Sequence, residues 1–172
     1  MEFSLDKSLE IIANTPVVIS TLLHNLSDDW TDRNEGENTW TVKEVVAHLI
    51  ECEQTNWLPR IRIVLNSPET VFAPMDMQAH MEQAKNHSLG ELLVQFDQLR
   101  ANAIRELKQY DLKEEDFLKT ATHPVIGKVS LVNLISTWTA HDMTHLAQIA
   151  RIIARQNKEL VGNFKQYLNI LN

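Results

Sequence analysis

Apolar residues recur every three to four positions along four stretches of the chain, which is the spacing of one face of an α-helix. The first stretch runs from about Ser8 to Leu26, with leucines on its apolar side. Pro16 either kinks this helix or occupies the first helical position, with Thr15 as the cap. The pattern therefore predicts a long helix near the start of the chain.

The second stretch opens at Thr41, and the spacing of Thr41 and Glu44 fits a capping box. Its apolar pattern continues towards Trp57. Pro59 ends or kinks this helix, and residues 61–65 continue the pattern beyond it.

A second capping box at Ser88 predicts a third helix that extends through Leu107. Ser130 is the predicted cap of the fourth helix, from Leu131 to about Gln156. Residues 66–87 and 111–129 are predicted to be connections, because both contain helix breakers. The tail has enough apolar character to dock on the body, through Phe164, Tyr167 and Leu168.

Four amphipathic helices of this length predict an all-α fold, a four-helix bundle formed by a single domain over residues 1–172. The connection over residues 66–87 is long enough to cross the whole bundle. We therefore expect a long crossover between the second and third helices, which would make these two helices parallel.

Composition narrows the class of protein. Hydrophobic residues make up 44% of the chain and charged residues 23%, which is typical of a globular protein. The formal net charge of −7 argues against a nucleic-acid partner. We also expect no membrane partner, because no apolar run is long enough to span a bilayer. The chain lacks a secretory signal pattern and has a single cysteine, Cys52, so a cytoplasmic location is expected.

His141 and His145 are the most informative residues of the fourth helix. Residues four apart lie on one helical face, with Cβ atoms about 5–6 Å apart, so one divalent metal can bridge both rings. They also fall on the apolar stripe of the helix, which predicts that both rings point inward. A pair of hydrogen-bonded core or surface histidines is the alternative interpretation.

His48 is the candidate third ligand. It lies on an apolar face of the second predicted helix, and bundle cores commonly hold metals between facing helices. Three imidazoles leave coordination positions open, as catalytic sites do. Taken alone, His48 is better interpreted as an ordinary core histidine.

Glu44 and Asp142 are weak candidates for a catalytic proton acceptor. The capping box already explains Glu44. Asp142 points about 100° away from His141 around the helix, so it is predicted to bond a neighbouring element or to be a surface carboxylate.

Cys52 lies four residues after His48 and is either a soft metal ligand, a nucleophile or, in the favoured interpretation, a core residue. His123 is predicted near the mouth of a pocket, while His80 and His87 are predicted at the surface. Three tryptophans are default core aromatics that could also wall a pocket, namely Trp40, Trp57 and Trp138.

Two segments resemble the signatures of a known family. Residues 39–49, TWTVKEVVAHL, followed by Trp57, are similar to the first signature of the DinB/YfiT-like superfamily. Residues 137–149, TWTAHDMTHLAQI, are similar to its second signature. Thr15-Pro16, the Leu99-Arg100 region and residues 123–131 also match, so the resemblance covers nearly the whole chain.

The resemblance implies a four-helix bundle with a long crossover, often a homodimer. It also implies a divalent metal, often nickel or zinc, held by His48, His141 and His145. Characterised members of the family include thiol-dependent S-transferases that use bacillithiol or mycothiol, a thiol-dependent isomerase, and proteins described as metal-dependent hydrolases.

Three functions follow as hypotheses. The leading one is a metal-dependent S-transferase that joins a low-molecular-weight thiol to a small electrophile, because a coordinating cation stabilises the reactive thiolate. The second is a metal-dependent hydrolase, which needs a proton acceptor near the ion. The third is a non-enzymatic protein of the stress response that binds a metal or a small ligand.

Overall fold

Side-chain caps start the four long helices of the structure, a computed structural model that describes residues 2–67, 70–76 and 78–171. Ser4, Thr41, Ser88 and Ser130 each accept a hydrogen bond from a backbone N–H in the first helical turn. These N–H groups have no partner within the helix itself. The helices are α1 (Leu5–Leu23), α3 (Val42–Thr55), α6 (Leu89–Gln109) and α7 (Leu131–Arg155).

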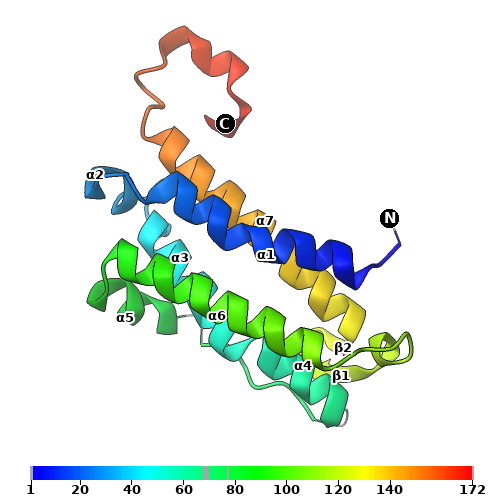
Figure 1. Cartoon of the computed structure of the whole chain (residues 1–172). Coiled ribbons are helices and arrows are strands. Elements are labelled where there is room, and N and C mark those ends of the chain that lie inside the picture. Colours follow the sequence, from blue (N-terminus) through cyan, green and yellow to red (C-terminus); the bar gives the residue numbers. More distant parts are fainter. Residues whose placement is uncertain (1, 68–69, 77, 172) are drawn as a thin grey trace.

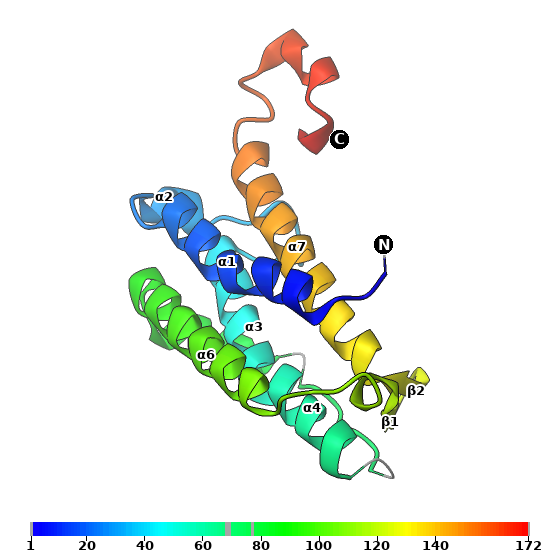
Figure 2. The same cartoon turned by 45° about the vertical axis from the view of Figure 1, so that its right-hand side comes forward.

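These four helices form the predicted four-helix bundle (Figures 1 and 2). Helix α3 packs against α6 and α7, and α1 packs against the same two helices. The interior contains two clusters of buried apolar side chains. One surrounds Trp57 and Trp138, and the other surrounds Phe96 and Ile149. None of the helices in the described part of the chain is long and apolar enough to span a membrane.

Helix α1 begins earlier than predicted and continues through Pro16 without ending there. Proline has no N–H, so the carbonyl of Ile12 lacks its usual helical donor. Arg100 on α6 supplies a replacement, since its Nη1 donates to the Ile12 carbonyl oxygen at 2.6 Å. A side chain from a neighbouring helix therefore satisfies the carbonyl that Pro16 leaves free.

The second predicted helix is divided at Asn56 into α3 and α4 (Trp57–Asn66). Pro59 cannot donate to the carbonyl of Thr55, and its ring would clash with that carbonyl in a continuous helix. The chain restarts its helix before Pro59, which then lies in a first turn where no N–H is needed. Residues 61–65 belong to α4, as the pattern predicts.

The two long connections contain structure that the sequence pattern does not predict. Residues 66–87 include a short helix, α5 (Ala79–Asn86), which packs against α3; residues 68, 69 and 77 lie outside the described part. The second connection includes an antiparallel hairpin of β1 (Thr120–His123) and β2 (Gly127–Ser130). Gly127 has a φ of +76°, which favours glycine in this turn. Two short elements complete the body, α2 (Asp28–Thr31) and the 3₁₀ turn η1 (Asp116–Leu118).

The predicted docking of the tail is wrong for two of its aromatic residues. After α7 the chain turns away and forms two 3₁₀ segments, η2 (Gly162–Tyr167) and η3 (Asn169–Leu171), which extend from one end of the bundle (Figure 2). Phe164 is 73% exposed and Tyr167 is 75% exposed. Leu171 is the one buried residue in the described part of the tail, and η3 contacts α7. A change of chain direction, which apolar content alone cannot predict, decides which side chains reach the body.

Candidate metal centre

Helices α3 and α7 bring together the three predicted metal ligands, His48, His141 and His145, which we call the histidine cluster. His48 Nε2 lies 3.2 Å from His141 Nε2, and His145 Nε2 lies 3.1 Å from the same atom. The four-residue spacing of the two α7 histidines places both rings on the face that meets α3. Three ring nitrogens from two helices therefore converge on one small volume.

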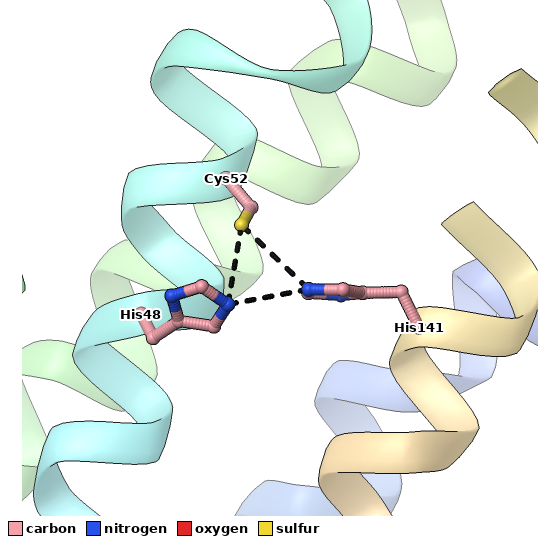
Figure 3. A group of neighbouring side chains, drawn as sticks. All are labelled: His48, Cys52 and His141. Atoms are coloured by element: carbon pink, nitrogen blue, oxygen red, sulfur yellow. Dashed lines mark hydrogen bonds between the residues drawn. The ribbon is translucent and has the colours of Figure 1, made fainter. Parts of the chain in front are cut away.

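Cys52 also reaches this volume. Its Sγ lies 3.5 Å from His48 Nε2 and 3.8 Å from His141 Nε2 (Figure 3). In the described residues, His48, Cys52 and His141 have ligand atoms that all lie within 4.8 Å of one another, as a metal site requires. Cys52 is buried in the apolar core, as the favoured interpretation predicts, but it contacts two candidate ligands as well.

Burial keeps the histidine cluster uncharged. It lowers the pKa of His48 and that of His141 to about 3, and neighbouring histidines lower both pKa values further. Burial also lowers the pKa of His145. The same effect raises the pKa of the Cys52 thiol to about 12. The three rings are therefore neutral at pH 7, and neutral imidazole is the form that binds a metal.

The donor set of the histidine cluster fits a cation. His145 Nδ1 lies 2.8 Å from Gln148 Oε1, and an amide oxygen only accepts, so the proton of His145 is on Nδ1. A lone pair of His145 Nε2 then faces His141 Nε2, which also faces His48 Nε2. One N–H at His141 can satisfy only one of these two neighbours. A divalent ion accepts lone pairs from all three rings.

Two tryptophans flank the histidine cluster. The Trp40 ring centroid lies 4.8 Å from that of His48, and the Trp57 ring meets His141 edge-on at 5.0 Å. Trp138 stacks on Trp57 at 5.8 Å and is completely buried. Trp57 and Trp138 are thus core aromatics, whereas Trp40 is half-buried; Trp40 and Trp57 also form walls beside the candidate ligands.

His80 is buried, so the prediction that it lies at the surface is wrong. It is 1% exposed, whereas His87 at the end of the same helix is exposed as predicted. The His80 ring lies 4.5 Å from Trp40 and 5.4 Å from His48, measured between centroids. The sequence gives no helical pattern in this connection, so the contact between α5 and α3 could not be predicted.

A shallow hollow of about 460 Å³ lies on the outer side of α7 and borders His141. His141 is half-buried and lines this hollow together with residues on the outer side of α7, among them Thr137, Ala140 and Thr144. A small molecule in the hollow would contact the ring of His141. The His141 ring is therefore reachable from solvent on the outer side of α7.

A buried ion-pair network links α6 to α3 and α7, the two helices that carry the candidate ligands. Arg100 on α6 donates to both carboxylate oxygens of Asp142, at 2.6 and 3.0 Å, and to Glu53 Oε1 at 3.0 Å. Asp142 directly follows His141, and Glu53 directly follows Cys52. Asp142 is completely buried, so the prediction of a bond to a neighbouring helix is confirmed and that of a surface carboxylate is wrong.

Both weak candidates for a proton acceptor are engaged in hydrogen bonds with other residues. Glu44 Oε2 accepts a hydrogen bond from the Thr41 N–H at 2.7 Å in the predicted capping box. Asp142 binds Arg100 with both oxygens. His123, predicted near a pocket mouth, is the last residue of β1, and its Nδ1 accepts from the N–H of Val125 in the hairpin turn at 3.2 Å.

The sequence also matches known proteins. A family model of the DinB superfamily matches residues 12–149. The chain belongs to the DinB superfamily. It is 24% identical over 157 residues to a protein of Bacillus cereus strain B4264, covering 91% of this chain and 89% of the relative. A protein of Bacillus mycoides strain KBAB4 is 23% identical over 89% of this chain and 87% of its own length. Both relatives are named, provisionally, as metal-dependent hydrolases.

Two solved structures share the fold of this chain. YfiT from Bacillus subtilis superposes with a TM-score of 0.80 at 21% identity, over 91% of each chain. That protein is described as a candidate metal-dependent hydrolase with an unusual four-helix bundle topology. TT2238, a four-helix bundle protein, superposes with a TM-score of 0.58 at 19% identity, over 86% of this chain and 98% of its own.

Proposed function

We propose that this protein is a metal-dependent hydrolase that holds a divalent ion, zinc or nickel, with His48, His141 and His145. The convergence of three neutral imidazoles on one volume carries this proposal. The names of the relatives support hydrolysis over the S-transfer that the sequence analysis favours. Imidazole nitrogens suit both zinc and nickel.

The chain contributes a preformed site. When bound, the ion would polarise a substrate oxygen and lower the pKa of water. His48 would hold it from α3, while His141 and His145 would hold it from α7. Three protein donors are the number found in catalytic zinc sites, which keep one position for a reactant. The aromatic walls and the apolar core around them limit water at the site.

His145 is our choice of third donor over Cys52. The hydrogen bond from His145 Nδ1 to Gln148 fixes the ring with its Nε2 lone pair directed at His141. Such outer hydrogen bonds orient metal-binding histidines in many proteins. Cys52 contacts His48 and His141 and is the alternative third donor.

Thiol S-transfer is the second candidate function. Glu44 and Asp142 are both engaged in other bonds, and a metal-bound thiol needs no separate base to become nucleophilic. This observation favours a low-molecular-weight thiol as a reactant. It does not identify the electrophile.

Elemental analysis of purified variants tests the donor set. We expect His145→Ala to lose most of the bound metal, while Cys52→Ser and the surface control His87→Ala keep it. Metal content unchanged in His145→Ala would contradict the assignment. Loss of metal in Cys52→Ser with retention in His145→Ala would transfer the third position to Cys52.

Activity assays separate the two functions. The metal-loaded protein is tested against a panel of esters and amides, and with several cellular thiols against a monochlorobimane-type electrophile. We expect ester or amide hydrolysis that is absent from the metal-free protein and from His145→Ala. Metal-dependent bimane conjugation without hydrolysis would overturn the hydrolase proposal in favour of S-transfer.

A further inference from the structure

His80 is a buried polar side chain whose hydrogen-bonding capacity is unused. It is 1% exposed, and neither ring nitrogen has a hydrogen-bond partner in the described part of the structure. A buried donor or acceptor without a partner costs stability, so most such groups in native proteins are satisfied by the protein or by a bound molecule. An aliphatic side chain would fill this position without that cost.

The position of His80 links it to the histidine cluster. Its ring lies edge-on to His48 and to Trp40. Trp40 in turn stacks with His145 at 6.1 Å between ring centroids. The rings of His80, Trp40 and His145 therefore each pack against the ring of His48, while Cys52 contacts its Nε2.

His80 has the chemistry to bind an oxygen-containing reactant. A neutral imidazole carries one N–H donor and one acceptor nitrogen. Neither nitrogen of His80 bonds to a protein atom in the described residues, so both are available to a molecule at the cluster. Helix α5 presents this ring from a third element, next to the candidate ligand His48.

We propose that His80 donates a hydrogen bond to an oxygen atom of the molecule that binds beside His48 and His145, and so positions that molecule for reaction. This inference rests on the proposed function, because it requires a reactant at the metal centre. The chemical class it specifies is an oxyanion or a carbonyl compound. His80 then makes a polar contact to the reactant, whereas Glu44 and Asp142 are bonded to other residues.

Cobalt-substituted protein provides the test. Cobalt(II) reports its ligand environment by visible absorption, and acetohydroxamate is an oxygen-donor probe that changes this spectrum when it binds. The variants are His80→Phe, which keeps an aromatic ring beside Trp40, and His80→Gln, which keeps a donor and an acceptor. His87→Phe is the matched control, because His87 is an exposed histidine next to the same helix.

We expect all four proteins to bind one equivalent of cobalt with the same spectrum before the probe is added. Acetohydroxamate should bind about 10-fold more weakly to His80→Phe, the loss expected for one hydrogen bond. His80→Gln should recover most of the affinity, and His87→Phe should match the wild type. If His80→Phe does not fold, His80→Leu replaces it in the same titration.

The outcomes separate the inference from the proposed function. Equal acetohydroxamate affinity in the wild type and in the apolar variants would overturn the role of His80. Loss of cobalt from His80→Phe or His80→Leu would also overturn it, since it would make His80 a ligand or a structural support. Failure of the wild type to bind cobalt would overturn the proposed metal centre itself.

Discussion

The side chain of Gln148 controls the direction in which His145 presents its lone pair. The 2.8 Å contact between Gln148 Oε1 and His145 Nδ1 leaves Nε2 as an acceptor. Without it, the ring can rotate or shift its proton to Nε2, and both changes weaken metal binding. The Nε2 lone pair of His145 is therefore directed by a residue that is not itself a candidate ligand.

Replacing Gln148 tests this role. We expect Gln148→Ala to lower the affinity for zinc about 10- to 100-fold, the usual cost of losing such an orienting bond. Competition with a chromogenic chelator measures the affinity, and Gln98→Ala, an exposed glutamine on α6, is the control. Unchanged affinity in Gln148→Ala would show that the ring is held by packing alone.

The sequence predicted the candidate ligands better than their surroundings. His141 and His145 share a helix, so their spacing alone places their rings together. His48 was proposed from its place on an apolar helical face and is implied by the family resemblance, since no local pattern relates residues 93 positions apart. The contacts of Asp142 with Arg100 and of His80 with Trp40 also join distant segments, and no pairwise signal in one sequence reveals them.

At the scale of helices, Arg100 joins three elements at one point. It lies on α6, pairs with Glu53 on α3 and Asp142 on α7, and donates to the Ile12 carbonyl on α1. Both Glu53 and Asp142 are almost completely buried. Removal of Arg100 would leave two buried carboxylates without their cation and one carbonyl without its donor.

We expect Arg100→Met to lower the free energy of unfolding by about 3–5 kcal/mol, as for other buried ion pairs that lose one partner. Urea denaturation measures this change. Arg62→Met is the matched control, because Arg62 forms an exposed pair with Glu106 that should contribute about 0–1 kcal/mol. Similar effects of the two substitutions would mean that the buried network adds no more than a surface pair.

A second ion pair, between Glu35 and Arg151, links the loop before α3 to the last turns of α7. Glu35 accepts hydrogen bonds from Arg151 at 2.6 and 2.7 Å, and these bonds hold the pKa of Glu35 below its ordinary value of 4.5. The folded state therefore favours the charged carboxylate. This contribution to stability is present above pH 4.5 and is lost as the pH falls through the lower, folded-state pKa.

Substitution of Glu35 should change the pH dependence of stability. We expect Glu35→Gln to be less stable than the wild type at pH 7, with a difference that shrinks as the pH falls below 4.5. Urea denaturation across the pH range measures it, and Glu37→Gln, at an exposed neighbour, is the control. A difference that stays constant with pH would exclude ionisation of Glu35 as its cause.

Local signals account for which elements were predicted. Thr41 and Ser88 start helices through capping boxes that are visible within four residues of sequence. Helix α5 was not predicted, because its two buried residues, His80 and Ala84, do not form a recognisable apolar pattern. This helix depends on α3 for a surface to pack against. The four-residue strands of the hairpin depend on each other in the same way.

At the scale of the whole molecule, the candidate metal centre lies within an apolar core. Two apolar clusters surround it, and their members come from all four bundle helices. Ordinary apolar burial therefore stabilises the fold on both sides of the histidine cluster. This arrangement differs from that of small zinc domains, in which the ion replaces a missing core.

Removal of the ion should consequently leave the bundle folded. We expect the protein treated with a chelator to keep its helical circular dichroism and to unfold cooperatively, at a lower temperature than the zinc-loaded form. The shift should grow with the concentration of free zinc, because the ion binds the folded state preferentially. His145→Ala provides the control, since its unfolding temperature should not respond to zinc. Loss of helical signal on chelation alone would assign the ion a structural role, and the open coordination position on which hydrolysis depends would lose its support.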